Sequence, residues 1–189
     1  MQRSQQDKLH YVKRYQMVYN LVAQPVYETE LPPNFVWIPW HPRFVDDHAR
    51  MVYLGFRGEL DSLIFPTFRR FDSCLRLMRQ VCGNAKFLPK SCWLVAQVVS
   101  GGGFEYYATI QGLRGSTHIG EIQNLAVLAS ARRRGLAEAV LRRSLCGFLE
   151  SGCQKVTLEV TAENRPALQL YRKVGFDIFQ TIYKETWLD

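Results

Sequence analysis

The chain has 189 residues, of which 47% are hydrophobic and 22% charged, and this suits one soluble globular domain with its own core. Its formal net charge of +7 is spread over several arginine-containing segments without a nucleic-acid-recognition motif, so we expect no nucleic-acid partner. No stretch has the ~18 uninterrupted apolar residues of a membrane helix, and the polar N-terminus lacks an apolar signal region, so we expect a cytoplasmic protein without membrane attachment.

The N-terminal half is expected to contain a lead-in, two strands and two helices. Residues 1–14 are polar and mixed in charge, which predicts a flexible lead-in and a folded domain over residues 15–189. The linker between the two helices carries Glu59 and Asp61. Period-2 alternation and proline positions predict the following bounds: strands over 15–21 and 35–38, and helices over about 41–55 and 72–81.

The C-terminal half shows clearer patterns. Strands are predicted over 93–99, 106–113, 119–128, 156–160, 176–179 and 181–187, and helices over 133–150 and 165–173. The alternation of strand and helix implies at least one parallel crossover, while the hairpin before it is antiparallel. The sequence therefore predicts a single α/β domain with a mixed sheet.

Cysteine and histidine positions give no sign of a metal or a disulfide framework. The five cysteines contain no C-x-x-C pair, which predicts free thiols, and no metal-ligand spacing is visible, so we expect no metal. His41 lies beside Pro42 and His48 lies on the first predicted helix. We expect both histidines to be helix caps or surface groups.

The segment Arg132-Arg133-Arg134-Gly135-Leu136-Ala137 joins a predicted strand to a predicted helix. The first N–H groups of a helix have no partner within it, and the helix dipole favours an anion there. Gly135 would allow close backbone approach, and the small Ala137 would leave the first turn uncrowded. The segment predicts a pyrophosphate site, although neither of the two common glycine-rich phosphate motifs is present. The alternative is a solvated arginine-rich turn.

A second segment, Asn164 to Phe176, follows after one more helix and strand. Asn164 suits an N-cap, and Gly175 suits the end of a short helix. Tyr171 lies seven residues from Asn164, about two helical turns further along. The two segments therefore place a tyrosine on a helix that follows the predicted anion site.

With these two segments, the chain resembles the GCN5-related N-acetyltransferase family. Arg132-x-x-Gly135-x-Ala137 matches the family's acyl-CoA pyrophosphate motif, Q/R-x-x-G-x-G/A, and Asn164…Leu170-Tyr171…Gly175-Phe176 matches its second C-terminal motif. The resemblance runs from about Glu121 to the C-terminus, over a third of the chain, while the N-terminal half agrees only in the order of elements. It implies one domain with a mixed central sheet flanked by helices on both faces.

The resemblance also implies a cofactor and a set of binding residues. The family transfers an acyl group, usually acetyl, from coenzyme A directly to an amine in a ternary complex. Acetyl-CoA is therefore the expected acyl donor. By the resemblance, Leu125, Ala126 and Val127 splay at a bulge and bind the pantetheine arm; Arg132, Arg133, Arg134, Gly135, Leu136 and Ala137 hold the pyrophosphate; Asn164 and Tyr171 line the far side of the cofactor.

The reaction needs a base, an oxyanion donor and a proton donor for the departing thiolate. A lysine-like amine has a reference pKa near 10.4, so it must lose a proton before it attacks. We assign Tyr171 as the general acid and Glu121 as the base, with Glu159 as the alternative base. Glu59 and Asp61 border the expected acceptor site, where they would attract a cationic amine unless they are only exposed linker charges.

The sequence thus predicts an N-acetyltransferase that acts on a primary amine of a small molecule or peptide. The alternative is a catalytically inactive acyl-CoA-binding sensor or scaffold module. The strand around Tyr183 to Trp187 also offers an edge through which a homodimer could form.

Overall fold

The computed structural model describes residues 8–188, and over these residues one seven-stranded sheet forms the centre of the molecule. The strands are β1 (Lys8–Asn20), β2 (Phe35–Pro39), β3 (Trp93–Val98), β4 (Phe104–Ser116), β5 (Ile119–Val127), β6 (Lys155–Thr161) and β7 (Asp177–Leu188). The helices are α1 (Val45–Phe56), α2 (Leu60–Ile64), α3 (Phe71–Cys82), α4 (Leu136–Glu150) and α5 (Arg165–Val174), with 3-10 turns η1 (Pro42–Phe44), η2 (Pro66–Arg69), η3 (Pro89–Ser91) and η4 (Ala129–Ala131).

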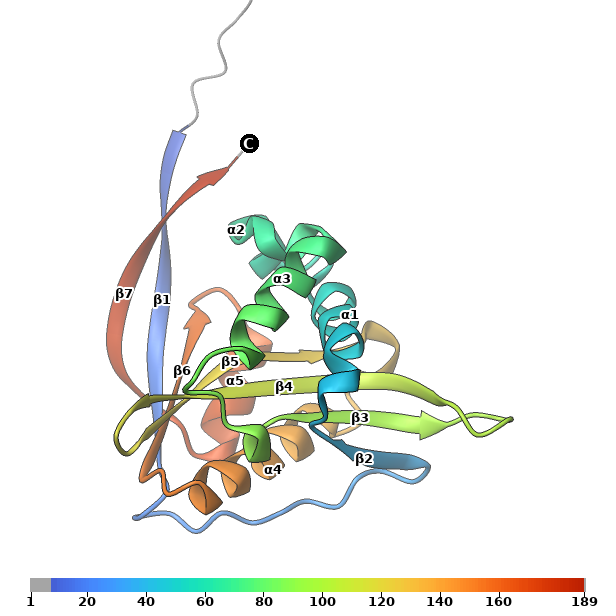
Figure 1. Cartoon of the computed structure of the whole chain (residues 1–189). Coiled ribbons are helices and arrows are strands. Elements are labelled where there is room, and N and C mark those ends of the chain that lie inside the picture. Colours follow the sequence, from blue (N-terminus) through green and yellow to red (C-terminus); the bar gives the residue numbers. More distant parts are fainter. Residues whose placement is uncertain (1–7, 189) are drawn as a thin grey trace, which may run out of the picture.

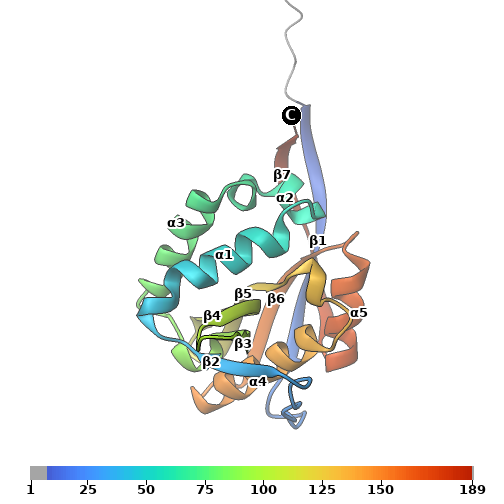
Figure 2. The same ribbon diagram turned by 90° about the vertical axis from the view of Figure 1, so that its right-hand side faces the viewer.

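The strands lie in the order β2-β3-β4-β5-β6-β1-β7. The neighbours β5 and β6 are parallel, and every other adjacent pair among the described strands is antiparallel. Helices α1 to α3 cover one face and α4 and α5 cover the other (Figures 1 and 2). The predicted single α/β domain with a mixed sheet and helices on both faces is confirmed.

The core between the sheet and α4 depends on two glycines in adjacent strands. A Cβ at Gly112 of β4 or at Gly120 of β5 would come within 2.3 Å of the ring of Phe148, which is fully buried on α4. Glycine at both positions therefore lets α4 lie close to the sheet. Because side chains alternate along a strand, Glu121 points to the opposite face of the sheet.

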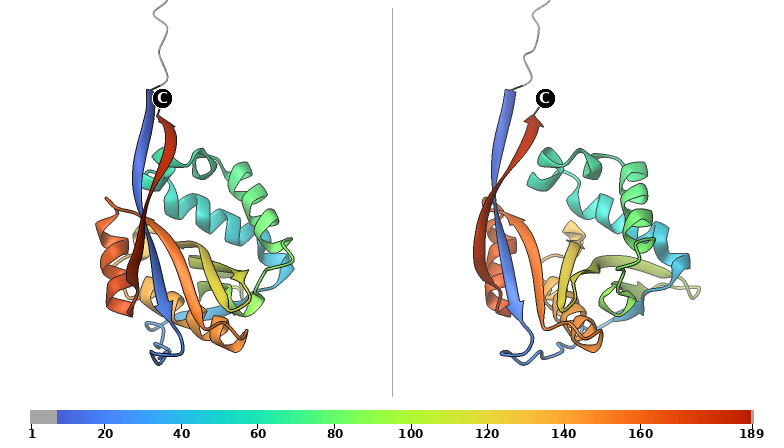
Figure 3. Two further views of the ribbon diagram at one scale, coloured as in Figure 1. Left: turned by 90° about the vertical axis from the view of Figure 1, so that its left-hand side faces the viewer. Right: turned by 60° about the vertical axis from the view of Figure 1, so that its left-hand side comes forward.

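Strand β1 corrects the expected flexible lead-in over residues 1–14. From Lys8 onward the chain is a strand that pairs with β7, and from Arg14 onward it also pairs with β6. Residues 1–7 lie outside the described residues. The outer parts of β1 and β7 extend beyond the other strands as a two-stranded ribbon (Figures 1 and 3). A ribbon with little core contact does not need alternating apolar residues. Residues 8–14 therefore lack the pattern from which a strand is predicted.

Three smaller expectations are also corrected. The two closing strands are one strand, β7, with a register shift opposite Gln16 and Met17 that accommodates one extra residue, Phe179. The short helix α2 lies within the segment expected to be a linker. His48 is not a surface group, because it is fully buried on α1 with its Nδ1 2.8 Å from Thr109 Oγ1.

Other predictions are confirmed. His41 caps η1 by accepting a hydrogen bond from the backbone N–H of Arg43, and Asn164 and Gly175 cap the two ends of α5. The remaining strands and helices lie within a few residues of their predicted bounds. Among the residues described, none of the helices has the length and apolar content needed to cross a bilayer.

Candidate active site

A large cleft of about 1410 Å³ opens where β5 and β6 diverge. The two strands pair only from Ile119 to Glu121 on β5, opposite Lys155 to Thr157 on β6. Both motif segments contribute residues to the wall of this cleft, and so do β1, β7 and the segment that joins α1 to α2. The parallel crossover therefore brings the candidate cofactor and catalytic residues into one space.

The end of β5 offers unpaired backbone groups to the cleft. Leu125 and Val127 lie opposite Ile110 and Ala108 of β4, while their other side has no strand partner in the described ladder. The carbonyl of Val127 accepts from Arg132 Nε at 3.3 Å, so the backbone groups of Val127 point away from β4. By the period of two, those of Leu125 point the same way. The predicted splay is confirmed.

The bulge lies earlier than expected. The β4–β5 register passes from Gln111 opposite Asn124 to Gly112 opposite Ile122, which leaves Gln123 as the extra residue. The expectation of a bulge at Leu125–Val127 is therefore wrong by about two residues. A bulge at Gln123 increases the local twist just before β5 departs from β6, so it still assists the splay.

The start of α4 has the open helix N-terminus that the predicted anion site requires. Gly135, the N-cap residue, has φ 83°, a left-handed conformation that favours glycine, and no atom lies within 4 Å of where its Cβ would be. The first hydrogen bond of the helix runs from Ala139 N–H to the Gly135 carbonyl at 3.0 Å. The N–H groups of Leu136, Ala137 and Glu138 therefore have no partner within the helix, and the space above them is open.

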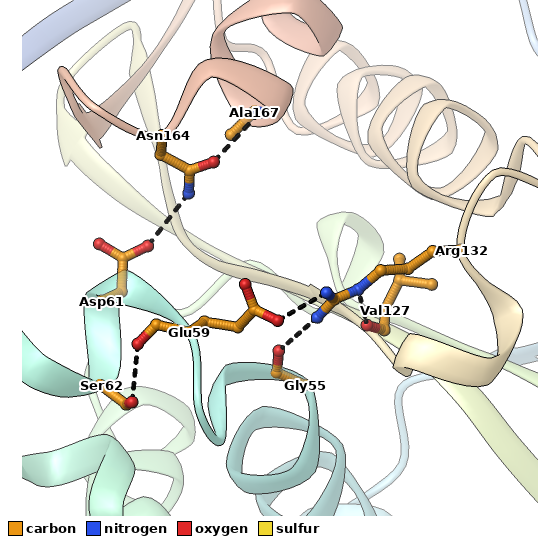
Figure 4. A network of polar contacts seen from close by, with 8 residues as sticks. All are labelled: Gly55, Glu59, Asp61, Ser62, Val127, Arg132, Asn164 and Ala167. Carbon is orange, nitrogen blue, oxygen red and sulfur yellow. Dashed lines mark hydrogen bonds and ion pairs between the residues drawn. The ribbon is translucent and has the colours of Figure 1, made fainter.

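The three consecutive arginines have different surroundings. The guanidinium of Arg132 binds the carbonyl of Gly55 at 3.1 Å and the carboxylate of Glu59 at 2.6 Å, in addition to Val127 (Figure 4). Arg133 is exposed and lines the cleft. Arg134 lies 4.7 Å from the ring centroid of Phe35, and its side chain is outside the lining of the cleft. Arg132 thus connects the loop to α1, and Arg133 is the arginine best placed for an anion.

Glu138 places a carboxylate in the first turn of α4, where it would repel a phosphate. Lys173 Nζ lies 2.5 Å and Arg142 Nη2 3.1 Å from its two oxygens. The hydrogen bond from Lys173, followed by that from Arg142, lowers the pKa of Glu138. These cations balance its charge, and Lys173 itself lines the cleft.

Asn164 connects the second motif to α2. Its Oδ1 accepts from the Ala167 N–H at 3.2 Å as the N-cap of α5, and its Nδ2 donates to Asp61 Oδ2 at 3.3 Å (Figure 4). Asn164 lines the cleft, as expected, but both of its polar side-chain atoms already have partners. Asp61 belongs to α2 and is only 14% exposed, so it is not the solvated linker charge of the alternative interpretation.

Tyr171 is buried in the wall of the cleft, with only 8% of its surface exposed. Burial raises the pKa of Tyr171, the negative charge of Asp61 raises it further, and the positive charge of Arg14 opposes both effects. Its hydroxyl therefore stays protonated near neutral pH and can donate a proton. This is the state that a general acid needs.

The two candidate bases lie in different environments. Glu121 is exposed on the cleft side of β5 and folds toward Gly115, and no ion pair to it is present among the described residues. Glu159 lies 3.4 Å from Arg14 Nε and accepts from Gln16 Nε2 at 3.1 Å. The occupied carboxylate of Glu159 favours Glu121 as the group that is available to a substrate.

The end of the cleft beside β1 and β7 contains residues that sequence reasoning did not identify. Arg14 and Gln16 come from β1, and Lys184 of β7 lies 4.5 Å from the ring centroid of Phe65. For Arg14 and Gln16 the sequence offers one indication, because these polar residues alternate with Tyr15 and Met17. Apolar side chains complete this end of the cleft: Phe56, Phe65, Phe68 and Leu77.

No cysteine is prepared to act as a nucleophile. Burial raises the pKa of all five thiols, and that of Cys92 reaches about 12. The thiolate is the reactive form, so these groups are poorly suited to form an acyl intermediate. Over the part of the chain that the structure describes, no group of His, Cys, Asp and Glu side chains could hold a metal ion.

Comparison with known proteins gives a family for this arrangement. The sequence model of the "Acetyltransferase (GNAT) family" matches residues 76–176. The N-alpha-acetyltransferase MAK3 of Arabidopsis thaliana is 39% identical over 67 residues, which make up 35% of this chain and 35% of that protein.

Solved structures share the fold. A GCN5-related N-acetyltransferase from Sphaerobacter thermophilus superposes with a TM-score of 0.67 at 23% identity, over 94% of this chain and 53% of that one. The NatC complex bound to Gag peptide and CoA gives a TM-score of 0.63 at 18% identity, over 82% of this chain and 99% of the matched one. This chain therefore spans about a third of the Arabidopsis relative and about half of the Sphaerobacter chain.

Proposed function

Because the chain belongs to the GNAT family of acetyltransferases, we propose that it transfers the acetyl group of acetyl-CoA to a primary amine by direct attack in a ternary complex. One observation carries this proposal. A single cleft joins the open N-terminus of α4 to Tyr171 and to the carboxylates Glu121 and Glu159. An anionic donor and an amine can therefore meet within it.

The cofactor would use mainly backbone groups. The unpaired N–H groups at the start of α4 suit the pyrophosphate, with Arg133 and Lys173 as nearby cations. The backbone groups of Leu125 and the N–H of Val127 suit the amides of a pantetheine arm, because they present the donors and acceptors of an open strand edge. This placement brings the thioester toward Tyr171, on the far wall of the cleft.

The reaction then proceeds with a balanced set of proton transfers. Glu121 takes a proton from the acceptor ammonium, directly or through water, and the neutral amine attacks the thioester carbonyl. As the C–N bond forms, backbone N–H groups at the end of β5 stabilise the oxyanion. The attacking nitrogen, which is positively charged after the attack, loses its second proton to solvent, and Glu121 releases the first one there too. The C–S bond then breaks, and Tyr171 donates its proton to the departing thiolate. The products are an N-acetyl amine and free coenzyme A, and Tyr171 regains a proton from solvent.

The amine class is suggested by relatives. The Arabidopsis protein is named an N-alpha-acetyltransferase, and the NatC complex was solved with a peptide and CoA. Peptides with free α-amino groups are therefore the first acceptors to test, followed by small amines and polyamines. A cytoplasmic location stays a prediction, as does pairing of two copies through the edge strand β7.

Two measurements test the proposal in order. Calorimetric titration with acetyl-CoA should show binding, and lack of heat up to high micromolar concentration would contradict the cofactor assignment. Thiol release from acetyl-CoA should then rise above background hydrolysis with at least one amine. Binding without amine-dependent thiol release would instead support the inactive acyl-CoA-binding module.

A further inference from the structure

Arg14 is a nearly buried charge contributed by the N-terminal strand. Only 8% of the residue is exposed, and its Nη1 donates to Thr161 Oγ1 at 3.0 Å. Carboxylate oxygens of Glu159 and Asp61 lie 3.4 and 3.8 Å from its nitrogens, and the ring centroid of Phe65 lies 4.8 Å from its Cζ. A guanidinium this deeply buried has a substantial desolvation cost, so its position requires these partners.

Asp61 connects α2 to β6, to the start of α5 and to β1. Its Oδ1 accepts from Thr161 of β6 at 2.9 Å, and its Oδ2 accepts from Asn164, the N-cap of α5. Arg14 of β1 supplies the positive charge. The carboxylate of Asp61 therefore fixes the beginning of α5 relative to the sheet.

Tyr171 lies on the same helix, about two turns beyond Asn164. The charges of Asp61 from α2 and Arg14 from β1 both act on the pKa of its hydroxyl, and they do so in opposite directions. A rigid helix transmits the position of its capped end to Tyr171. The Arg14–Asp61 pair is thus connected to Tyr171 both by the helix and by electrostatics.

We propose that Arg14 is a positioning residue for acetyl transfer, which acts with Asp61 to fix α5 and to hold the Tyr171 hydroxyl at the thioester end of the cleft. The inference rests on the proposed function, since it requires Tyr171 to be the acid. The inference goes beyond the two motif segments, because Arg14 lies on β1 and Asp61 on α2, and both residues are outside those segments.

The pair has consequences that a merely structural contact would lack. Without Arg14, the negative charge beside Tyr171 is unopposed, so the tyrosine becomes a weaker acid. Without Asp61, the positive charge of Arg14 is closer to unopposed, and the pKa of Tyr171 falls. The two removals therefore shift the same hydroxyl in opposite directions.

The first test measures Tyr171 directly and needs no substrate. Tyrosine labelled with ¹³C at Cζ is followed by NMR at neutral pH, and Tyr171→Phe identifies the signal. In Asp61→Asn we expect the Tyr171 signal to move, because the position of α5 and the charge near the ring both change. The matched control is Glu59→Gln, which removes a carboxylate two residues away that faces Arg132 instead and should leave the signal in place. An unmoved Tyr171 signal in Asp61→Asn overturns the proposal.

The second test measures turnover in variants that remain folded. Arg14→Gln should lower kcat by about 10- to 100-fold while the KM for acetyl-CoA changes by about twofold or less, since the pair acts on the acid through α5 and contributes nothing to the anion site at the start of α4. Arg14→Lys should restore part of the rate. The double variant Arg14→Gln/Asp61→Asn should lose less than the sum of the two single losses, because neither member of the pair then remains without the other.

The outcomes separate the two claims. Wild-type protein without acetyl transfer contradicts the proposed function, and the NMR comparison of Tyr171 still decides whether the pair controls this residue. Wild-type activity together with an unchanged kcat in Arg14→Gln overturns the positioning role alone. Should Arg14→Gln fail to fold, Asp61→Asn and the double variant carry the same comparison.

Discussion

The two ends of the cleft are built in different ways. The cofactor end uses backbone groups, at the open edge of β5 and at the N-terminus of α4, and all of them lie within one stretch of sequence. The proposed acceptor end uses side chains that come from β1, from α2 and the segment before it, and from β6, which are distant in sequence. A site made of backbone groups requires particular residue types at only a few positions. A site made of side chains can take a different ligand after a few substitutions that leave the fold intact.

This difference explains why one end can be assigned a ligand more easily than the other. A pyrophosphate needs N–H groups in fixed positions, and Gly135 with its left-handed backbone is the main requirement on sequence. An amine needs only carboxylates and a pocket of suitable shape, and many arrangements supply these. Variants can therefore be chosen that damage one end of the cleft and not the other.

The largest effect is expected at the place where the two ends meet. Tyr171→Phe removes the proposed proton donor and should lower kcat by roughly 10²–10⁴-fold, with acetyl-CoA affinity nearly unchanged. Steady-state kinetics with calorimetry would separate the two quantities. An unchanged rate would remove Tyr171 from the mechanism.

A smaller effect is expected from the base. Glu121→Gln should lower kcat by about 100-fold near neutral pH, whereas Glu159→Gln should cost less, because Glu159 is held by Arg14 and Gln16. The loss in Glu121→Gln should shrink as the pH approaches the pKa of the acceptor amine, since the amine then needs no base. A larger loss of kcat in Glu159→Gln than in Glu121→Gln would make Glu159 the base instead of Glu121.

The anion site can be tested with a matched pair of glycines. Gly135→Ala places a Cβ in the open space above α4 and should weaken acetyl-CoA binding by about tenfold or more, with a backbone strain of about 1–2 kcal/mol. The control is Gly152→Ala, because Gly152 also has a positive φ and open surroundings but lies outside the cleft lining. Calorimetry on both should show weak binding in Gly135→Ala alone, and equal affinities would contradict a backbone anion site.

The smallest effect on turnover is expected from His48, which affects only stability. Burial lowers the pKa of His48 to about 3 from its ordinary value of 6.5. As the pH falls, the imidazole is therefore protonated in the unfolded chain before it is protonated in the folded one. Above pH 6.5 the imidazole is neutral in both states and does not change the free energy of unfolding with pH. Below it, stability should decrease by about 1.4 kcal/mol per pH unit until the folded pKa is reached.

Chemical denaturation at several pH values would measure this dependence. His48→Gln should show a shallower loss of stability between neutral and acidic pH than the wild type. The control is His118→Gln, because His118 is exposed in the β4–β5 turn. Identical pH slopes in wild type and His48→Gln would contradict a buried neutral histidine.

The sequence predicted the parts that depend on local pattern. The Asn164 cap, Gly175 and the α4 start at Gly135 follow from turn and helix-end chemistry within a few residues. The mixed sheet followed from the order of elements. Each of these features is decided by neighbours along the chain.

The parts that were missed depend on contacts between distant segments. Arg14 acquires its role because β1 inserts between β6 and β7, a pairing that no local pattern indicates. His48 was expected at the surface, yet Thr109 and Gln111 of β4 give it polar partners inside the protein. Arg132 completes a motif, but its guanidinium binds Gly55 and Glu59 because α1 ends beside it.

The most direct test of the account is a rapid-quench single turnover with acetyl-labelled acetyl-CoA and an accepted amine. Direct attack predicts that the label passes from coenzyme A to the amine at the rate of thiol release, without labelled protein at any time, and that Tyr171→Phe slows both together. Label that accumulates on the protein before it reaches the amine, or thiol release without labelled amine, would contradict it.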